Sequence, residues 1–225
     1  MSDASWGRAA RVAGLGAVAF NVLGVAALSN VPGAYRPGDL GGWYRGLLER
    51  PLEAQASAWC FVLGLLLLAV FFVLVAAGAP CRSRGLLVAG AALGSLGAAV
   101  NAAGSAAPLA VVRFLPDPAF PGAEAVARGM LGFALATDAA FNLVLGLGLV
   151  TVNVALGPDS GWPRWQRALG VAAGLASVPV AGQVGSDGWA RLLAISGPLW
   201  LAWIAASCLA GPWRKSAAAD DGGRR

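Results

Sequence analysis

Six long apolar segments constrain this chain more than any other feature of its sequence. They cover residues about 12–31, 58–78, 86–107, 130–156, 168–185 and 190–211. Each is close to the ~20 apolar residues with which an α-helix crosses about 30 Å of hydrocarbon. A helix also bonds its own backbone polar groups, which a bilayer requires. The sequence therefore predicts an all-α, polytopic integral membrane protein, with six transmembrane helices in one bundle.

The composition supports a single membrane domain that takes in residues 1–225. Only 12% of the residues are charged and 58% are hydrophobic, whereas soluble domains carry about 25% charged residues. The chain also has 32 glycines, and small residues allow transmembrane helices to pack closely. A chain of 225 residues suits one compact bundle rather than two domains.

Two of the segments leave alternatives open. Segment 168–185 contains Pro179 and Gln183, so a re-entrant segment that does not fully span is the alternative there. The first segment follows basic residues and ends in small ones, as a cleaved signal peptide does. Its apolar run is longer than the ~7–15 residues of a typical signal peptide and contains Asn21, which favours a retained span.

Arginine and lysine are distributed unevenly between alternate connections. If the N-terminus is cytoplasmic, the inside connections hold ten of them: Arg8, Arg11, Arg82, Arg84, Arg164, Arg167, Arg214, Lys215, Arg224 and Arg225. The outside connections hold six: Arg36, Arg45, Arg50, Arg113, Arg128 and Arg191. Because basic residues concentrate on the cytoplasmic side, we predict that both termini, including the tail 212–225, are cytoplasmic. The expected location is the cell membrane, specifically a bacterial inner (plasma) membrane.

The two longest connections, 32–57 and 108–129, then lie outside the membrane on the extracytoplasmic side. GGWYRGLLER, residues 41–50, is typical of a short amphipathic helix lying in the membrane interface. FLPDPAFPG, residues 114–122, has too many prolines for regular structure. These loops form either a lid over the extracytoplasmic mouth or a passive cap.

One carboxylate interrupts the apolar segments. Asp138, in TDAAFNLVLG, is the only acidic residue within the six segments. A charged side chain near the bilayer centre costs at least ~2.5–3.5 kcal/mol, so intramembrane acids usually mark a functional site. Asn142 follows four residues later and shares a helix face with Asp138.

Other segments supply candidate partners for this acid. They are Asn21 in the first segment, Asn101 and Ser105 in the third, and Gln183 in the fifth. One hypothesis is a ligand-binding or coupling site, made by Asp138, Asn142, Asn101, Asn21 and Ser105 around a small solute or ion. The other is an interhelical hydrogen-bond clamp with no ligand. Gly90, Gly94, Gly97 and Gly146 are predicted helix-packing positions.

The first and fourth segments share a short pattern. AVAFNVLG and DAAFNLVLG both contain Ala-Phe-Asn followed by apolar residues and a glycine. Three spans separate their starts, so the two halves would be inverted repeats of the kind found in secondary transporters. Chance similarity between apolar sequences is the alternative.

The residue inventory disfavours several other classes. The chain has no histidine, and Cys60, Cys81 and Cys208 show no C-x-x-C spacing, so we expect no metal site and no cofactor. There are no paired intramembrane carboxylates and no G-x-S-x-G motif, which disfavours an enzyme. No basic run is interleaved with aromatic residues, so we expect no nucleic-acid partner.

Three functions remain after these exclusions. The first is a small-solute or ion transporter or channel with Asp138 at its polar site. The second is a non-catalytic membrane scaffold or accessory subunit that packs against other membrane proteins or a second copy. The third is a lipid- or hydrophobic-ligand-binding protein, for which membrane lipids are the partners.

Overall fold

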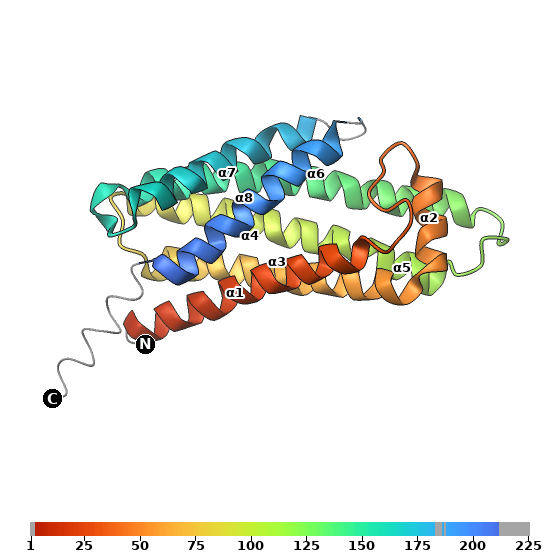
Figure 1. The fold of residues 1–225 in the computed structure, drawn as a ribbon, viewed down its shortest axis with the longest axis horizontal. Coiled ribbons are helices and arrows are strands. Elements are labelled where there is room, and N and C mark those ends of the chain that lie inside the picture. Colours follow the sequence, from red (N-terminus) through yellow and green to blue (C-terminus); the bar gives the residue numbers. More distant parts are fainter. Residues whose placement is uncertain (1–2, 183–185, 187, 212–225) are drawn as a thin grey trace.

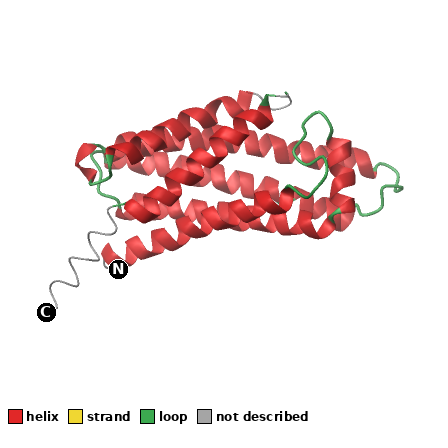
Figure 2. Ribbon diagram, in the orientation of Figure 1, coloured by secondary structure: helices red, strands yellow, loops and turns green. Residues whose placement is uncertain are grey.

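The computed structural model describes residues 3–182, 186 and 188–211. This part of the chain contains helices and no strand (Figure 2), in agreement with the predicted all-α class. The α-helices are α1 (Asp3–Leu28), α2 (Leu40–Glu49), α3 (Pro51–Gly78), α4 (Arg84–Ser105), α5 (Ala107–Phe114), α6 (Ala123–Leu156), α7 (Arg164–Gly182) and α8 (Trp189–Ala210). A short 3-10 turn at Pro158–Ser160 joins α6 to α7.

The long helices pack in the order of the sequence and close on themselves. α1 packs against α3, α3 against α4, α4 against α6, α6 against α7 and α7 against α8, while α8 returns to α1. The start of α1 and the end of α8 lie at one end of the bundle, here called the terminal end (Figure 1). α2 and the loop 115–122 lie at the opposite end, here called the loop end.

Five of the described helical segments are long and apolar enough to cross a membrane. They are Ser5–Leu28, Pro51–Gly78, Arg84–Phe114, Ala123–Leu156 and Arg191–Ala210. The chain is therefore compatible with a multi-pass helical membrane protein. The sixth predicted segment, 168–185, corresponds largely to α7, which is not among these five. The described helix ends at Gly182 and begins with the polar residues Arg164, Gln166 and Arg167, which lower its mean hydropathy.

Several helices extend beyond the apolar segments that predicted them. α3 begins at Pro51 rather than near residue 58, and α6 begins at Ala123 rather than near residue 130. α5 continues past the end of α4 after a break at Ala106. The predicted loop 108–129 is thus mostly helical, and the irregular part is confined to 115–122. An apolar run marks only the part of a helix that suits hydrocarbon, whereas the helix itself continues into polar sequence.

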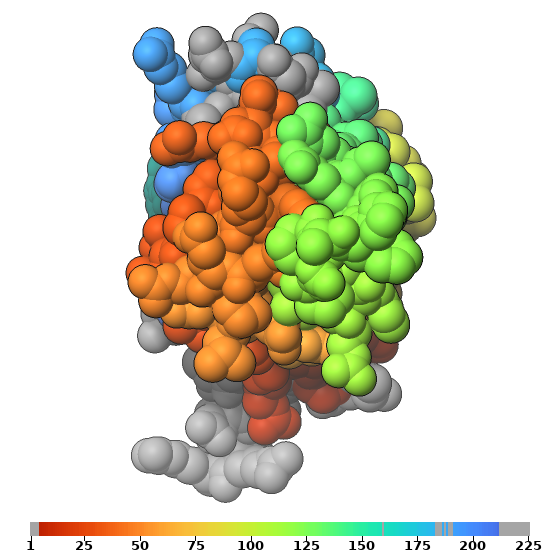
Figure 3. All heavy atoms as spheres, turned by 90° about the vertical axis from the view of Figure 1, so that its right-hand side faces the viewer, coloured from red at the N-terminus to blue at the C-terminus, as the bar shows by residue number. Residues whose placement is uncertain are grey.

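α2 lies across the loop end of the bundle with its apolar face against protein. Trp43, Tyr44 and Leu47 are fully buried, whereas Arg45 and Glu49 are exposed. The Tyr44 hydroxyl donates a hydrogen bond to the carbonyl of Leu115 at 2.8 Å. Burial is the main cause that raises the pKa of Tyr44. Figure 3 shows this end covered by atoms of the α2 region (orange) and of the region around the 115–122 loop (green).

Glycines allow α6 to approach its two neighbours closely. A Cβ at Gly90 of α4 would lie 2.8 Å from the backbone nitrogen of Val152, and one at Gly146 would lie 2.7 Å from the carbonyl of Gly174 in α7. Gly97 also faces α6, in ordinary van der Waals contact. Gly94 instead faces the ring of Phe72 in α3, at 2.7 Å from a Cβ built there. Side chains at Gly90, Gly94 and Gly146 would force these helices apart.

Aromatic rings fill the interior near the terminal end. The Trp203 indole stacks on Phe72 with ring centroids 6.2 Å apart and on Trp162 at 6.5 Å. Phe71 meets Trp203 edge-on at 6.1 Å. Phe71, Phe72 and Trp203 are fully buried, so this half of the bundle has a packed core.

Candidate functional site

The carboxylate of Asp138 lies inside the bundle and is bonded by two side-chain amides. Asp138 is only 6% exposed. Asn101 of α4 donates from Nδ2 to Asp138 Oδ1 at 2.8 Å. Asn142 donates from Nδ2 to Asp138 Oδ2 at 3.3 Å and to the Asp138 backbone carbonyl at 2.8 Å. We call Asp138, Asn101 and Asn142 the amide–carboxylate cluster.

Close packing of α4 on α6 brings the cluster together. Gly97, Asn101 and Gly104 recur at the spacing of one helix face, and Gly104 lies so close to Thr137 that a Cβ would overlap its hydroxyl oxygen. Thr137 turns that hydroxyl back to donate to the carbonyl of Ala134 at 2.9 Å. Asp138 therefore sits beside a point of very close helix contact.

The cluster contains more acceptors than donors. The ion pairs of the described residues are Arg50–Glu53 at 3.6 Å and Arg128–Glu124 at 2.6 Å, and neither includes Asp138. Asn101 Oδ1 is buried and has no hydrogen-bond partner among the described atoms. A buried acceptor without a partner costs about 1–3 kcal/mol. Because oxygen acceptors are in excess, the cluster is better suited to bind a proton or a small cation than an anion.

Tyr35 lies near the cluster, although the sequence did not point to it. Burial and, secondarily, the negative charge of Asp138 raise the pKa of Tyr35 well above its usual value, so its hydroxyl stays neutral. Tyr35 adopts a left-handed backbone conformation with φ 55°. A cavity of about 10 Å³ lies beside Tyr35, Ser57 and Ser105, about the room that one water molecule takes.

The remaining predicted site residues lie apart from the cluster or outside the described residues. Asn21 is buried between α1 and α3, where its Nδ2 donates to the Ala17 carbonyl at 2.8 Å and lies against Gly64. None of the hydrogen bonds found among the described residues joins Asn21 to Asp138. Ser105 lines the small cavity with Tyr35. Gln183 lies outside the described residues.

A second polar group lies near the C-terminal end of α6, and sequence reasoning missed it. Trp203 Nε1 donates to Asn153 Oδ1 at 3.1 Å, and Gln166 Nε2 donates to Ser207 Oγ at 3.0 Å. All four side chains are buried, and none is ionisable. We call these four residues the tryptophan–amide network. Asn153 follows Asn142 by about three helical turns on one face, which is the sequence signal that could have revealed it.

The proposed internal repeat gains no support from local bonding. Asn21 and Asn142 each donate to the backbone carbonyl four residues earlier, at 2.8 Å. Asn153, which lies outside the repeated pattern, makes the same bond to Leu149 at 2.8 Å. Three of the four buried asparagines in the described helices thus make this bond, so it is not specific to the repeat, and the repeat stays a prediction.

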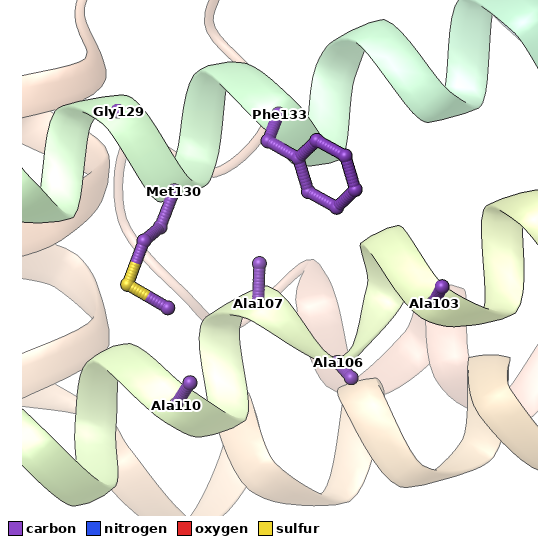
Figure 4. Close-up of a pocket in the computed structure, with 7 residues that line it drawn as sticks. All are labelled: Ala103, Ala106, Ala107, Ala110, Gly129, Met130 and Phe133. Atoms are coloured by element: carbon purple, nitrogen blue, oxygen red, sulfur yellow. The ribbon is translucent and has the colours of Figure 1, made fainter.

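An apolar groove lies between α5 and α6 on the loop-end side of Asp138. It has a volume of about 420 Å³ and is lined by Ala103, Ala106, Ala107, Ala110, Gly129, Met130 and Phe133. Figure 4 shows the side chains of Met130 and Phe133 reaching from α6 into the space above the alanines. None of these lining side chains is polar, so the groove suits hydrocarbon rather than a hydrated solute.

Within the described residues, no three or more His, Cys, Asp or Glu side chains form a group that could hold a metal ion. No protein-family model, curated protein or solved structure matches the chain.

Proposed function

We propose that this protein is a small membrane transporter or channel for a proton or a small cation, and that Asp138 binds or couples the translocated ion. The observation that carries the proposal is a buried carboxylate that accepts from two amides and has no cationic partner among the described residues. Intramembrane acids of this kind typically mark ion pathways and proton relays.

The chemistry assigns a separate task to each member of the cluster. The Asp138 carboxylate takes up the proton or contacts the cation, which removes its uncompensated charge. Asn101 and Asn142 hold the two carboxylate oxygens in place. The free Asn101 Oδ1 supplies a further neutral oxygen, a ligand type that suits hard cations.

Access to Asp138 differs between the two ends of the bundle. Towards the loop end, the water-sized cavity beside Tyr35 and Ser105 lies nearby. Towards the terminal end, Leu145 and Leu149 follow on the same face of α6 and are fully buried. Release in that direction therefore requires the helices around these leucines to move.

The proposal includes six membrane spans, with both termini in the cytoplasm of a bacterial cell and the protein in its inner membrane. α7 is the proposed sixth span, and its packing along α6 and α8 supports this. The start of α1 and the end of α8 lie at the same end, as an even number of crossings requires. The count in the sequence, ten arginines and lysines in the connections of the proposed inner side against six in the others, supports the cytoplasmic orientation of that side.

Flux through reconstituted protein tests the role of Asp138. Vesicles would carry a trapped pH-sensitive dye, and a potassium gradient with valinomycin would set the membrane potential. We expect the wild type to carry a proton flux that Asp138→Asn abolishes, because the amide cannot take up a proton or balance a cation. An asparagine can still accept from Asn101, so the variant should accumulate in the membrane at the normal level.

The matched control is Glu124→Gln, which makes the same chemical change in an exposed, ion-paired carboxylate and should leave flux unchanged. The same vesicles loaded with sodium- or potassium-sensitive dyes cover the small cations. If wild-type, Asp138→Asn and empty vesicles show the same flux for each of the three ions, the proposal is overturned.

The alternative of a scaffold or accessory subunit draws on the apolar outer surface of the bundle. Exposed side chains such as Val12, Leu23 and Val73 face the bilayer or a partner helix. Gly90 and Gly94, by contrast, pack within the chain. Under this alternative, Asp138→Asn is tolerated in every assay, and the protein co-purifies with a stoichiometric membrane partner.

A further inference from the structure

We propose that the groove between α5 and α6 binds one acyl chain of an anionic phospholipid, with its phosphate on Arg113. The site is separate from the proposed ion site. Its lining is formed by four alanines, a glycine, a methionine and a phenylalanine. The groove has a volume of about 420 Å³, and its lining side chains offer no hydrogen bond to water.

The position of the groove selects hydrocarbon as its content. It belongs to two segments that are apolar enough to span the membrane, Arg84–Phe114 and Ala123–Leu156. Ala103 and Gly129 are exposed at its surface, and a Cβ built at Gly129 meets nothing within 4 Å. The groove is therefore open towards the lipid, and Figure 4 shows the side chains of Met130 and Phe133 on either side of Ala107.

Charge at the loop end of the groove selects the headgroup. Ala106, Ala110 and Arg113 recur at the spacing of one helix face, so Arg113 continues the alanine wall towards the loop end. Arg113 is exposed, and no ion pair of the described residues includes it. The nearby Arg128 is already bonded to Glu124 at 2.6 Å. Arg113 is thus the cation left for a lipid phosphate, a contact worth about 1 kcal/mol at a membrane surface.

Lipid binding to the purified protein tests this proposal. The full chain would be delipidated in detergent and titrated with phosphatidylglycerol or phosphatidylcholine of identical acyl chains, and bound lipids counted by native mass spectrometry. Ala103→Phe fills the groove from an exposed position. We expect it to weaken binding of both lipids about tenfold, as loss of contact with ~2 CH₂ groups would do. Ala110→Phe is a second variant with the same expected result.

Matched variants separate the chain from the headgroup. Ala99→Phe adds the same ring to an exposed position of α4 outside the groove and should bind lipid like the wild type. Arg113→Gln should weaken phosphatidylglycerol about fivefold and phosphatidylcholine by less, because the choline cation of phosphatidylcholine already neutralises its phosphate. Arg45→Gln, at an exposed arginine of α2, should change neither.

Two results would overturn the inference. If both groove-filling variants bind the two lipids as tightly as Ala99→Phe does, no acyl chain occupies the groove. If Arg113→Gln binds phosphatidylglycerol as tightly as the wild type does and keeps the wild-type preference for it, Arg113 neither holds the phosphate nor selects the anionic headgroup. Neither result bears on Asp138, which the ion-flux assay tests separately.

Discussion

The bundle contains two buried polar groups, the amide–carboxylate cluster and the tryptophan–amide network. They differ in whether they contain an ionisable side chain. Each bonds side chains of different helices in an apolar interior. The network is neutral and lies against the aromatic core. The cluster contains an acid with no cationic partner among the described residues. Each group also contains one buried amide oxygen with no partner among the described atoms, Asn101 Oδ1 in the cluster and Gln166 Oε1 in the network, so the acid is what distinguishes them.

We propose that the network has a structural role and that the cluster has a functional one. A neutral pair holds helices together, with an average contribution of only ~0.6 kcal/mol in measured membrane proteins. A carboxylate adds nothing to such a clamp that an asparagine would not provide, and it costs at least ~2.5–3.5 kcal/mol to insert. The free-energy cost of placing Asp138 in the membrane is therefore not explained by a contribution to stability.

Moving the acid to the other group should have the largest effect on stability. Asn153→Asp places an oxygen where Nδ2 now donates to the Leu149 carbonyl at 2.8 Å, so two acceptors face each other. We expect the variant to lose about 2.5–3.5 kcal/mol of stability, the cost of a charge inside the membrane. Thermal unfolding in detergent measures this loss. Wild-type stability in Asn153→Asp would mean that the two groups do not differ in their tolerance of charge.

Removing one amide from the cluster should have the next largest effect. Asn101→Ala deletes the 2.8 Å bond to Asp138, and hydrogen bonds to charged groups contribute about 1.5–3 kcal/mol. We expect ion flux in vesicles to fall about tenfold or more, because the carboxylate is no longer held in position.

The control for Asn101→Ala is Trp203→Phe, which deletes one bond of the tryptophan–amide network and keeps an aromatic ring in the core. It should lower the unfolding temperature while ion flux per folded molecule stays at the wild-type value. A flux loss in Trp203→Phe as large as that in Asn101→Ala would remove the distinction between the two groups.

The smallest effect is expected at Tyr35. Tyr35→Phe removes the hydroxyl but keeps the ring, whose centroid lies 4.9 Å from that of Trp43. The Asp138 charge influences this hydroxyl only as a secondary cause of its raised pKa. We expect ion flux to fall about threefold, equivalent to ~0.6 kcal/mol, and thermal stability to stay unchanged. Flux at background level would instead place Tyr35 on the ion path.

Sequence patterns predicted much of the fold because they act within single helices. A run of about 20 apolar residues is long enough to span a bilayer wherever it lies, so five of the six predicted segments recur as candidate spans. Segment 168–185 was the exception, because the described helix α7 ends at Gly182 and begins with Arg164, Gln166 and Arg167, which lower its mean hydropathy. The spacing of Asp138 and Asn142 likewise put them on one face, and the structure joins them by a hydrogen bond.

What the sequence by itself determined is that this chain is helical and apolar and carries one acid within its apolar segments. Only the tertiary structure decided which polar residues meet: Asn101 reaches Asp138, whereas Asn21, in a similar sequence pattern, lies against Gly64. It also brought Tyr35 near Asp138 and turned the apolar face of α2 towards protein. The reason is that periodicity fixes directions around one helix axis, whereas the rotation and approach of neighbouring helices depend on contacts such as that of Gly104 with Thr137.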